Sequence, residues 1–153
     1  MNDKIKSKII LLDNIRSMQN VGAIFRNADG SWFNKIILTG YTPIPPRSDI
    51  SKTALQAETW IDWEYYENSI EIIQKLKKDW YKIYSVELTD DAIEYTKLFE
   101  ENNDKIVLIM WNEVLWVSKT LLDFSDKKVI IPMRWKKESL NVSVAAWIVM
   151  YAI

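Results

Sequence analysis

Residues 130–148 read IIPMRWKKESLNVSVAAWI and carry three signals in succession. The apolar segment Val129–Ile131 predicts a short strand that Pro132 ends, because proline cannot continue the hydrogen bonding of a sheet. A basic, polar segment follows. Asn141–Tyr151 then predicts a helix that is apolar all round, since Val142–Ile153 holds no charged residue. Helices of this kind are buried. We therefore expect the sheet to cover one side of this helix and a second copy of the chain to cover the other.

Upstream of this stretch, apolar runs alternate with amphipathic segments. Asn20–Asp29 has apolar residues at the spacing i, i+3, i+4 and i+7, which predicts a helix. A second helix is predicted over Ser69–Lys78, with Asn68 as its N-cap. Gly40–Pro46 holds three prolines and predicts an irregular loop. The alternation predicts one α/β domain over residues 1–153, with a mostly parallel sheet flanked by helices. Its strands are expected at Lys8–Leu12, Lys35–Thr39, Trp63–Tyr66, Tyr81–Val86 and Ile106–Met110.

Composition limits the chemistry that this chain can perform. Its 153 residues are 48% apolar and 27% charged, as in a soluble globular domain, and they include neither cysteine nor histidine. Disulfides, thiol nucleophiles, zinc sites built on Cys or His, and catalytic triads that need an imidazole are therefore excluded. We predict no metal site, because the carboxylate clusters Asp90–Asp91 and Glu100–Glu101 are interpreted as solvated surface.

The net charge of −1 conceals an uneven distribution along the chain. Residues 1–52 hold 8 basic and 4 acidic side chains, a net charge of +4. Residues 53–104 hold 5 and 13, a net charge of −8, and residues 105–153 hold 7 and 4, a net charge of +3. Two interpretations are open: a random scatter of surface charge, or two basic ends that meet in space and bind phosphate groups.

The sequence contains no recognisable targeting or membrane-spanning segment. Met1–Lys8 is polar and charged, unlike the apolar centre of a signal peptide. Val142–Ile153 is the longest uncharged apolar run, and its 12 residues fall short of the roughly 20 that span a bilayer. The sequence therefore predicts a cytoplasmic protein.

Three stretches together resemble, in order and spacing, the motifs of the SpoU/TrmH family of RNA 2′-O-ribose methyltransferases. They are Asn14–Gly30 (NIRSMQNVGAIFRNADG), Ile106–Ser118 (IVLIMWNEVLWVS) and Ile130–Ile148. The Gly40–Pro46 loop is also similar, and the resemblance runs from about Ile9 to the last residue. It implies an α/β knot fold whose C-terminal portion forms a deep trefoil knot. It also implies a homodimer, S-adenosyl-L-methionine as methyl donor, and tRNA or rRNA as substrate.

The resemblance covers nearly the whole chain, so we expect a single minimal SpoU-type methyltransferase domain. Members of the family often carry an additional RNA-binding domain or flanking helices. Here we expect RNA specificity to come from the surface of the dimer, with the C-terminal helix as its interface, or from a partner protein.

By this resemblance, Arg26 is the catalytic arginine; the alternative is an ordinary surface arginine on an amphipathic helix. Arginine is a poor base because its pKa exceeds about 12. We therefore expect Arg26 to bind an RNA phosphate as a bidentate fork and to stabilise the developing alkoxide. The resemblance assigns Glu113 to orienting this arginine. It also places Asn20, Ser139 and Asn141 at the reacting centre, although each of these three is also a candidate helix cap.

The resemblance also marks residues for the cofactor and for RNA. Trp111, Ile131 and Leu140 are expected at the cofactor, the last two through their backbone groups. Basic residues beside the motifs are expected to contact RNA phosphates. The alternatives are a solvated basic surface and, for Arg16, a structural ion pair. The residues expected to bind RNA are Arg16, Arg134, Lys136 and Lys137.

Tryptophan stands at six positions where the family usually has glycine. The chain holds 3 glycines and 8 tryptophans, whereas average usage predicts about 11 glycines. Overpacking typically costs about 1–3 kcal/mol per site, so the sequence taken literally should fold poorly and block its cofactor pocket. One interpretation is an inactive, RNA-binding knot protein. The other is a gene whose UGA codons encode glycine but are translated as tryptophan, which the survival of the polar motif residues favours. The six positions are Trp32, Trp80, Trp111, Trp116, Trp135 and Trp147.

Overall fold

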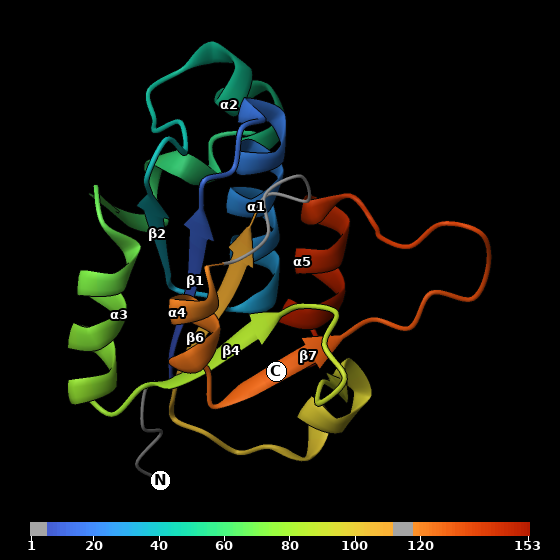
Figure 1. Cartoon of the computed structure of the whole chain (residues 1–153). Coiled ribbons are helices and arrows are strands. Elements are labelled where there is room, and N and C mark those ends of the chain that lie inside the picture. The colour runs from blue at the N-terminus through green and yellow to red at the C-terminus, as the bar shows by residue number, and fades with distance from the viewer. Residues whose placement is uncertain (1–5, 112–117) are drawn as a thin grey trace, which may run out of the picture.

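The computed structural model describes residues 6–111 and 118–153. Figure 1 follows the chain through its strands and helices. The strands are β1 (Ser7–Asp13), β2 (Lys35–Thr39), β3 (Asp62–Tyr66), β4 (Lys82–Val86), β5 (Ile93–Glu94), β6 (Lys105–Trp111) and β7 (Lys127–Ile130). The α-helices are α1 (Met18–Ser31), α2 (Ser48–Ala54), α3 (Ser69–Lys78), α4 (Lys119–Asp123) and α5 (Val142–Met150). Two 3₁₀ turns, η1 (Ala57–Thr59) and η2 (Tyr95–Glu100), complete the described elements.

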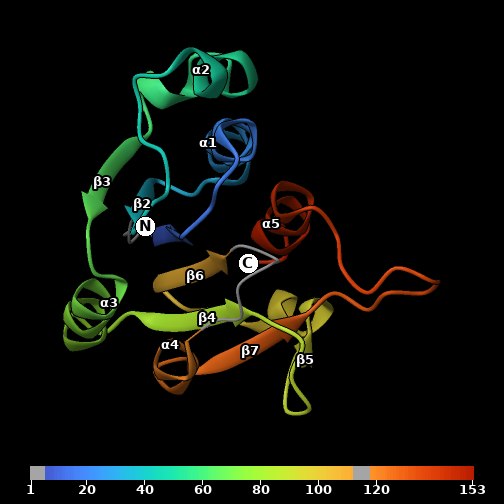
Figure 2. The same ribbon diagram turned by 45° about the horizontal axis from the view of Figure 1, so that its top comes forward.

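The strands form one sheet in the order β3-β2-β1-β6-β4-β7-β5, and every neighbouring pair in it is parallel. Helices α1, α2 and α5 cover one face of this sheet, and α3 and α4 cover the other (Figure 2). The prediction of a parallel sheet flanked by helices is confirmed. The carboxyl ends of parallel strands lie at the same edge of a sheet, where α/β proteins bind their ligands. That edge is therefore where the candidate site has to be sought.

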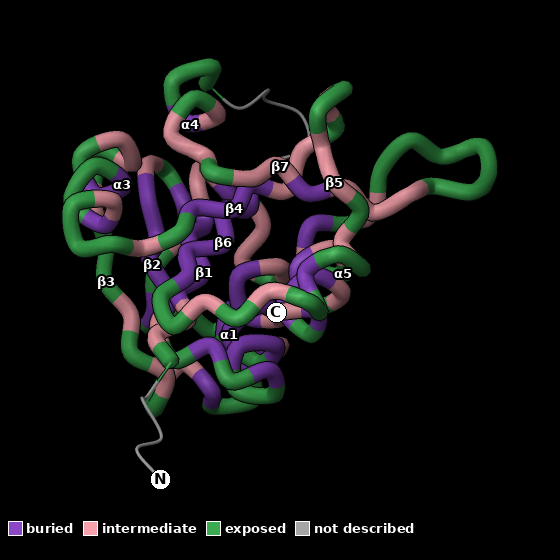
Figure 3. The backbone as a smooth tube through the Cα atoms, turned by 90° about the horizontal axis from the view of Figure 1, so that it is seen from below, coloured by how far each residue is buried: buried purple, intermediate pink, exposed green. Residues whose placement is uncertain are grey.

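Strand β1 lies near the centre of the sheet, and its side chains enter both layers of the core. Ile10 and Leu12 pack under α1 and α5, whereas Ile9 and Leu11 pack under α3. The alternation follows from the two-residue period of a strand. Because helices cover both faces of the sheet, the sequence of β1 is a continuous run of apolar residues and does not alternate between apolar and polar residues. Figure 3 shows the buried backbone concentrated in these central strands and in the adjoining face of α1.

Helix α1 packs closely against α2 at Gly22. A Cβ atom at Gly22 would lie 2.2 Å from the carbonyl oxygen of Ile50 and 2.2 Å from Oγ1 of Thr53. No side chain fits at that separation, so the crossing of the two helices requires glycine here. Helix α2 itself was not predicted, because its seven residues are too few for a periodic pattern.

Helix α5 buries only one of its sides in this chain. Val142, Ala146, Val149 and Met150 are buried on the sheet and α1. Other apolar side chains of the same segment are about half exposed, namely Val144, Trp147 and Tyr151. The predicted trefoil knot is not tested by the described contacts and stays a prediction. Within residues 6–111 and 118–153, helices are too short or too polar to cross a membrane.

Candidate active site

The first turn of α1 brings Asn20 to the carboxyl edge of the sheet. Ser17 is the N-cap of this helix, and its side chain accepts a hydrogen bond from the Asn20 N–H at 3.1 Å. The alternative that Asn20 itself caps α1 is therefore wrong. Instead, the Asn20 side-chain Oδ1 accepts a hydrogen bond from Nδ2 of Asn141 at 3.2 Å. The contact joins residues that are 121 positions apart in the sequence.

Asn141 has a second role as the N-cap of α5. Its Oδ1 accepts hydrogen bonds from the Ser143 N–H at 2.9 Å and from the Ser143 hydroxyl at 2.6 Å. The prediction that Asn141 caps this helix is confirmed, whereas Ser139 is exposed in the loop before it. One asparagine thus both starts α5 and holds that start against α1.

A further contact between the two helices was missed by the sequence analysis. Asn27 is 5% exposed, and its Nδ2 donates a hydrogen bond to the Ser143 carbonyl oxygen at 2.9 Å. Asn27 follows Asn20 by seven residues, about two turns, so the two amides lie on the same side of α1. The seven-residue spacing of these two asparagines is visible in the sequence, and it indicates that both side chains face the same neighbouring element.

The remaining predicted catalytic residues are not joined to this asparagine pair by the described contacts. Arg26 is exposed on α1, six residues after Asn20. Ser139 is exposed two residues before Asn141. Glu113 lies outside the described residues. The site in a single chain therefore consists of the Asn20–Asn141 pair, with Arg26 presented to solvent nearby on the same helix.

The predicted cofactor residues lie where β6 and β7 end. Trp111 is the half-buried last residue of β6, and its indole N–H donates a hydrogen bond to the Glu87 carboxylate at the end of β4. Burial raises the pKa of Glu87 above its ordinary value. Ile131 packs against the core just after β7, and Leu140 is half-buried before α5. The ends of three neighbouring strands therefore supply apolar side chains and one carboxylate.

Glu87 was also missed from the sequence. Its backbone N–H donates a hydrogen bond to the Val129 carbonyl oxygen at 3.0 Å, which holds it between β4 and β7. The sequence does show that a charged residue directly follows a buried strand. Such a position lies at the edge of a parallel sheet where ligands bind.

The four predicted RNA-binding residues are all exposed but lie on two different loops. Arg134, Lys136 and Lys137 lie on the segment between β7 and α5, which projects from the body of the domain (Figures 1 and 2). Arg16 lies between β1 and α1, with its guanidinium carbon 5.9 Å from the centre of the Tyr41 ring. Their contact with phosphate groups stays a prediction.

Trp32 and Trp80 occupy backbone positions that favour glycine. Their φ angles are 62° and 68°, in the left-handed region. Trp32 directly follows α1, and Trp80 follows α3 after the C-cap residue Asp79. Phe33 then donates its N–H to the Ala28 carbonyl, and Tyr81 donates its N–H to the Leu76 carbonyl. This is the pattern of a helix end at which glycine is preferred, because an L-residue there costs roughly 1–2 kcal/mol. Both indoles are 86% exposed.

The expectation of general overpacking by the tryptophans is wrong for most of the described positions. Trp32, Trp80 and Trp135 project into solvent, and the half-exposed Trp147 stacks on Tyr151 with ring centres 5.3 Å apart. These tryptophans are therefore unfavourable because of their backbone conformation or their solvent exposure, and not because their side chains overfill the core. Trp111 is half-buried and packs on the α3 and α4 side of the sheet, whereas the predicted cofactor residue Ile131 packs on the α1 and α5 side. Trp116 lies outside the described residues.

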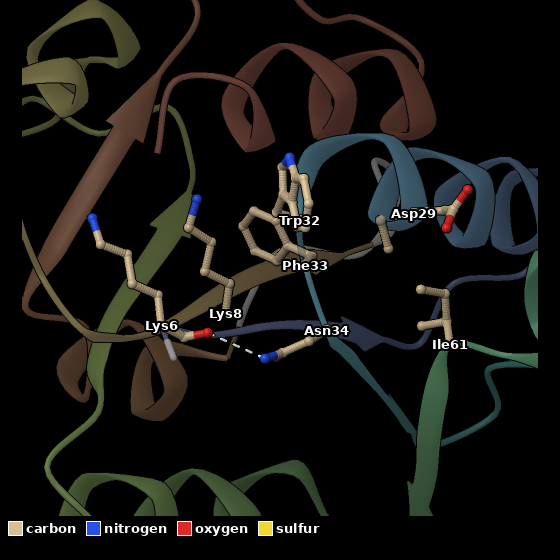
Figure 4. A pocket seen from close by; sticks show the side chains of 8 residues that line it. Lys6, Lys8, Asp29, Trp32, Phe33, Asn34 and Ile61 are labelled. Atoms are coloured by element: carbon tan, nitrogen blue, oxygen red, sulfur yellow. Dashed lines mark hydrogen bonds between the residues drawn. The ribbon is translucent and has the colours of Figure 1, made fainter. Parts of the chain in front are cut away.

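A hollow of about 780 Å³ adjoins Trp32 but lies away from this site. Figure 4 shows Lys6, Lys8, Phe33 and Asn34 around it, with the Asn34 side chain hydrogen-bonded to the Lys6 carbonyl at 3.2 Å. These residues precede or begin β1 and β2, so the hollow is at the amino-terminal edge of the sheet. The asparagine pair is at the opposite, carboxyl edge. Among the described residues, no group of three acidic side chains is placed to hold a metal ion.

A parallel sheet with polar loops at its carboxyl edge is typical of ligand-binding α/β proteins, and comparison with known proteins specifies the family. Residues 7–151 match the model of the SpoU rRNA Methylase family, and the chain belongs to this family. The match confirms the resemblance to the SpoU/TrmH family.

Two curated relatives indicate the activities found among similar proteins. The chain is 27% identical over 147 residues to "tRNA (guanosine(18)-2'-O)-methyltransferase" of Aquifex aeolicus, covering 95% of this chain and 68% of that protein. It is 32% identical over 145 residues to an "Uncharacterized tRNA/rRNA methyltransferase" of Borreliella burgdorferi, covering 95% of this chain and 62% of that protein. The chain thus spans about two thirds of the relatives that it matches. Both names favour an enzyme over the inactive alternative.

Solved structures agree in fold. The A. aeolicus TrmH/SpoU tRNA modifying enzyme superposes with a TM-score of 0.83 at 24% identity, covering 96% of this chain and 73% of that one. An AdoMet-bound rRNA methyltransferase from Sinorhizobium meliloti superposes with a TM-score of 0.86 at 22% identity, covering 95% of this chain and 55% of that one. The α/β fold predicted from the sequence is the fold of these enzymes.

Proposed function

We propose that this chain transfers a methyl group from S-adenosyl-L-methionine to a ribose 2′-hydroxyl of tRNA or rRNA, as a cytoplasmic homodimer. The observation that carries the proposal is the hydrogen bond between Asn20 and Asn141. It brings together two of the three stretches that resemble the family motifs, at the edge of the sheet where α/β proteins bind ligands.

The residues at the ends of β4, β6 and β7 fit the cofactor in chemical type. Ile131 and Leu140 are half-buried and apolar, as the adenine ring requires, and the Glu87 carboxylate is an acceptor for hydroxyl or ammonium groups. The bound cofactor supplies an electrophilic methyl group on a sulfonium. The indole of Trp111 adjoins Glu87, so glycine at this position would leave more room for the cofactor.

On the RNA side, this chain supplies positive charge and polar amides. Arg26 and Arg16 are exposed on the first motif stretch and are suited to binding phosphate groups. Holding the ribose hydroxyl in line with the methyl group accounts for much of the acceleration of such a displacement. As the 2′-oxygen attacks the methyl carbon, the C–S bond would break to leave a neutral thioether and the hydroxyl proton would pass to solvent water. A guanidinium close to that oxygen would stabilise the negative charge that develops on it. In this proposal Asn20 and Asn141 fix the geometry of the two motif loops around the acceptor.

The dimer is proposed from the exposed side of α5. Val144, Trp147 and Tyr151 follow one another at three- and four-residue spacing, and each is 47–50% exposed. They form one apolar stripe, which retains Val144 and Tyr151 if residue 147 is glycine. Contiguous exposed apolar side chains mark an interaction surface. A second copy of the chain would cover this stripe and would place two catalytic sites in one particle.

The experiment uses the purified full chain, methyl-labelled S-adenosyl-L-methionine, and unmodified transcripts of tRNA and rRNA. We expect label in RNA at linkages that resist alkaline cleavage, because a methylated 2′-oxygen cannot attack the neighbouring phosphate. Mass spectrometry of the nucleosides should place the added methyl group on ribose. Label confined to a base, or cofactor binding without any transfer to either RNA class, would contradict the proposal.

A further inference from the structure

A solvent-facing aromatic ring lies next to the candidate active site on the loop after β2. Tyr41 is 48% exposed, although the backbone that carries it is held in place. Its N–H donates a hydrogen bond to Oδ1 of Asn14 at 3.1 Å, and the Ile15 N–H donates one to Oγ1 of Thr42 at 3.0 Å. The loop after β2 is therefore attached to the first motif stretch, and the Tyr41 side chain projects from this attached backbone toward solvent.

The turn before Tyr41 can be made only by a residue without a side chain. Gly40 has a φ of +63°, and a Cβ atom there would lie 2.0 Å from Oδ1 of Asn14. From the neighbouring strand, the Tyr65 hydroxyl donates a hydrogen bond to the Gly40 carbonyl oxygen at 2.8 Å. The Tyr65 ring is itself 44% exposed. Two partly exposed aromatic side chains therefore flank this turn, Tyr41 on the loop after β2 and Tyr65 on β3.

A cation accompanies the first of these rings. The guanidinium carbon of Arg16 lies 5.9 Å from the centre of the Tyr41 ring, and Arg16 is exposed. An aromatic face beside an exposed arginine suits a nucleobase, which stacks on the ring, and its phosphate, which pairs with the guanidinium. Nearby carboxylates are neutralised or hydrogen-bonded within the protein: Asp49 pairs with Lys52 at 2.8 Å, and Asp13 accepts a hydrogen bond from Thr39 at 2.8 Å.

A shallow hollow continues this surface toward the start of α1. Its volume is about 510 Å³, and it is lined by Met18 from α1 and by Pro46, Arg47, Ser48 and Asp49 from the segment after β2. Arg47 adds a second exposed guanidinium to the same loop. The hollow can admit a second nucleotide next to the one that stacks on Tyr41.

We propose that Tyr41 is the stacking platform for a nucleobase of single-stranded RNA, with Arg16 and Arg47 binding the flanking phosphates. The inference rests on the proposed function, because RNA is the substrate of that site. The proposed function includes contacts with RNA phosphates and the ribose hydroxyl, and this inference adds a residue that contacts a base. The RNA strand would run from the loop after β2, across the start of α1, toward Asn20 and Asn141.

The test measures the affinity of the full chain for a fluorescent single-stranded oligoribonucleotide. An oligonucleotide of the same length with abasic sugars serves as the second probe. Stacking contributes about 1–3 kcal/mol per base, so Tyr41→Ala should weaken binding of the first probe about 5- to 150-fold. Binding of the abasic probe should change little. Tyr41→Phe should bind both probes like the unchanged protein, because stacking needs the ring and not the hydroxyl.

The salt dependence separates the roles of Tyr41 and Arg16. Loss of one phosphate contact with a single strand lowers the slope of log affinity against log salt by about 0.7. Arg16→Ala should show this lower slope, whereas Tyr41→Ala should keep the original slope. Phe99 is 67% exposed on η2, away from this surface, so Phe99→Ala is the matched control and should leave both affinities unchanged.

Equal affinity of Tyr41→Ala and the unchanged protein for the base-containing probe would overturn this inference alone. An unchanged protein that binds neither probe would overturn it together with the proposed function. Ultraviolet cross-linking gives an independent readout, since a stacked base should cross-link to the peptide that contains Tyr41. Because the side chain is exposed, the variants should unfold at the same temperature as the parent.

Discussion

Nδ2 of Asn141 donates a hydrogen bond to Oδ1 of Asn20 across 3.2 Å, and this contact joins the start of α5 to the first turn of α1. The same Asn141 side chain accepts the Ser143 N–H at 2.9 Å and thereby caps α5. One residue consequently sets the direction of the last helix and its position against the first. Together with the hydrogen bond from Asn27 to the Ser143 carbonyl oxygen, this side chain fixes the start of α5 against α1.

Replacing Asn141 should destabilise the protein more than replacing Asn20. Asn141→Ala loses both the cap and the bridge, so we expect the free energy of unfolding to fall by about 1–2 kcal/mol. Asn20→Ala loses the bridge alone and should cost about 0.5–1.5 kcal/mol. In the double variant the two losses should be less than additive. Urea unfolding of the four proteins measures this coupling, and strict additivity would mean that the hydrogen bond contributes nothing in solution.

Glycine at the two left-handed positions should stabilise the chain. Trp32→Gly and Trp80→Gly each relieve a residue at positive φ, and we expect each to raise the free energy of unfolding by about 1 kcal/mol. Trp60 is the matched control: it is also exposed, but its φ is −125° and its indole N–H donates a hydrogen bond to Asp29 at 2.9 Å. Trp60→Gly should therefore lower stability.

The nucleotide sequence of the gene provides the independent check on these glycines. Codons at positions 32, 80, 111, 116, 135 and 147 should read UGA, and codons 22, 30 and 40 should belong to the ordinary glycine set. If the six codons read UGG, the tryptophans are genuine. The half-buried Trp111 indole then has to be accommodated by the cofactor, and weak cofactor binding is expected.

The ion pair of Glu101 and Lys127 should make stability depend on pH in the acid range. The hydrogen bond from Lys127 is the largest cause that holds the pKa of Glu101 below its ordinary value, followed by the one from the Tyr84 hydroxyl. A lowered pKa in the folded state stabilises the protein above the pKa of the unfolded state, about 4.3. That stabilisation is lost as pH falls through the lowered pKa.

Glu101→Gln should consequently be less stable than the parent at pH 7 and no less stable well below pH 4. Chemical unfolding at a series of pH values measures the difference. Glu100→Gln, which changes the exposed neighbouring carboxylate, should show no such trend. A difference between Glu101→Gln and the parent that is the same at every pH would refute the electrostatic explanation.

The exposed stripe on α5 should be the dimer interface. Val144→Glu places a charge at the centre of an apolar contact, and we expect it to produce monomers at micromolar concentration while the parent is a dimer. Light scattering measures both masses. The control is Thr120→Glu on α4, which is exposed on the other face of the sheet and should leave the mass unchanged. A parent protein that is monomeric at micromolar concentration would contradict the proposal.

Much of this fold could be predicted from sequence, because its strands are continuous apolar runs. Helix α3 was predicted with its observed bounds and with Asn68 as its cap, since both the periodicity and the capping residue are local signals. Helices α2 and α4 and strand β5 were missed, because elements of two to seven residues have no measurable period. Their stability comes from tertiary packing, which a local pattern does not contain.

In the candidate site, too, the features set by neighbouring residues could be predicted, and those set by tertiary packing could not. Asn141 could be predicted as a cap because capping depends on neighbouring residues. The partner of its amide could not be predicted by local reasoning, since the Asn20–Asn141 contact depends on how α1 and α5 pack. The local rule in fact misassigned Asn20, because Ser17 begins α1 three residues earlier. Tyr41 gave no signal in the sequence, and only the attachment of its loop to Asn14 brings it beside Arg16.

The most direct test of the account is methyl transfer by Arg26→Ala. Arg26 is exposed on α1, so the substitution should leave folding and cofactor affinity intact. Removal of one charge-stabilising donor typically costs about 100- to 1,000-fold in rate. We therefore expect the single-turnover rate of ribose methylation by the pure protein to fall at least 100-fold, while calorimetry shows unchanged binding of S-adenosyl-L-methionine. A variant that methylates RNA ribose at the parental rate would contradict the assignment of this chain's catalytic residue.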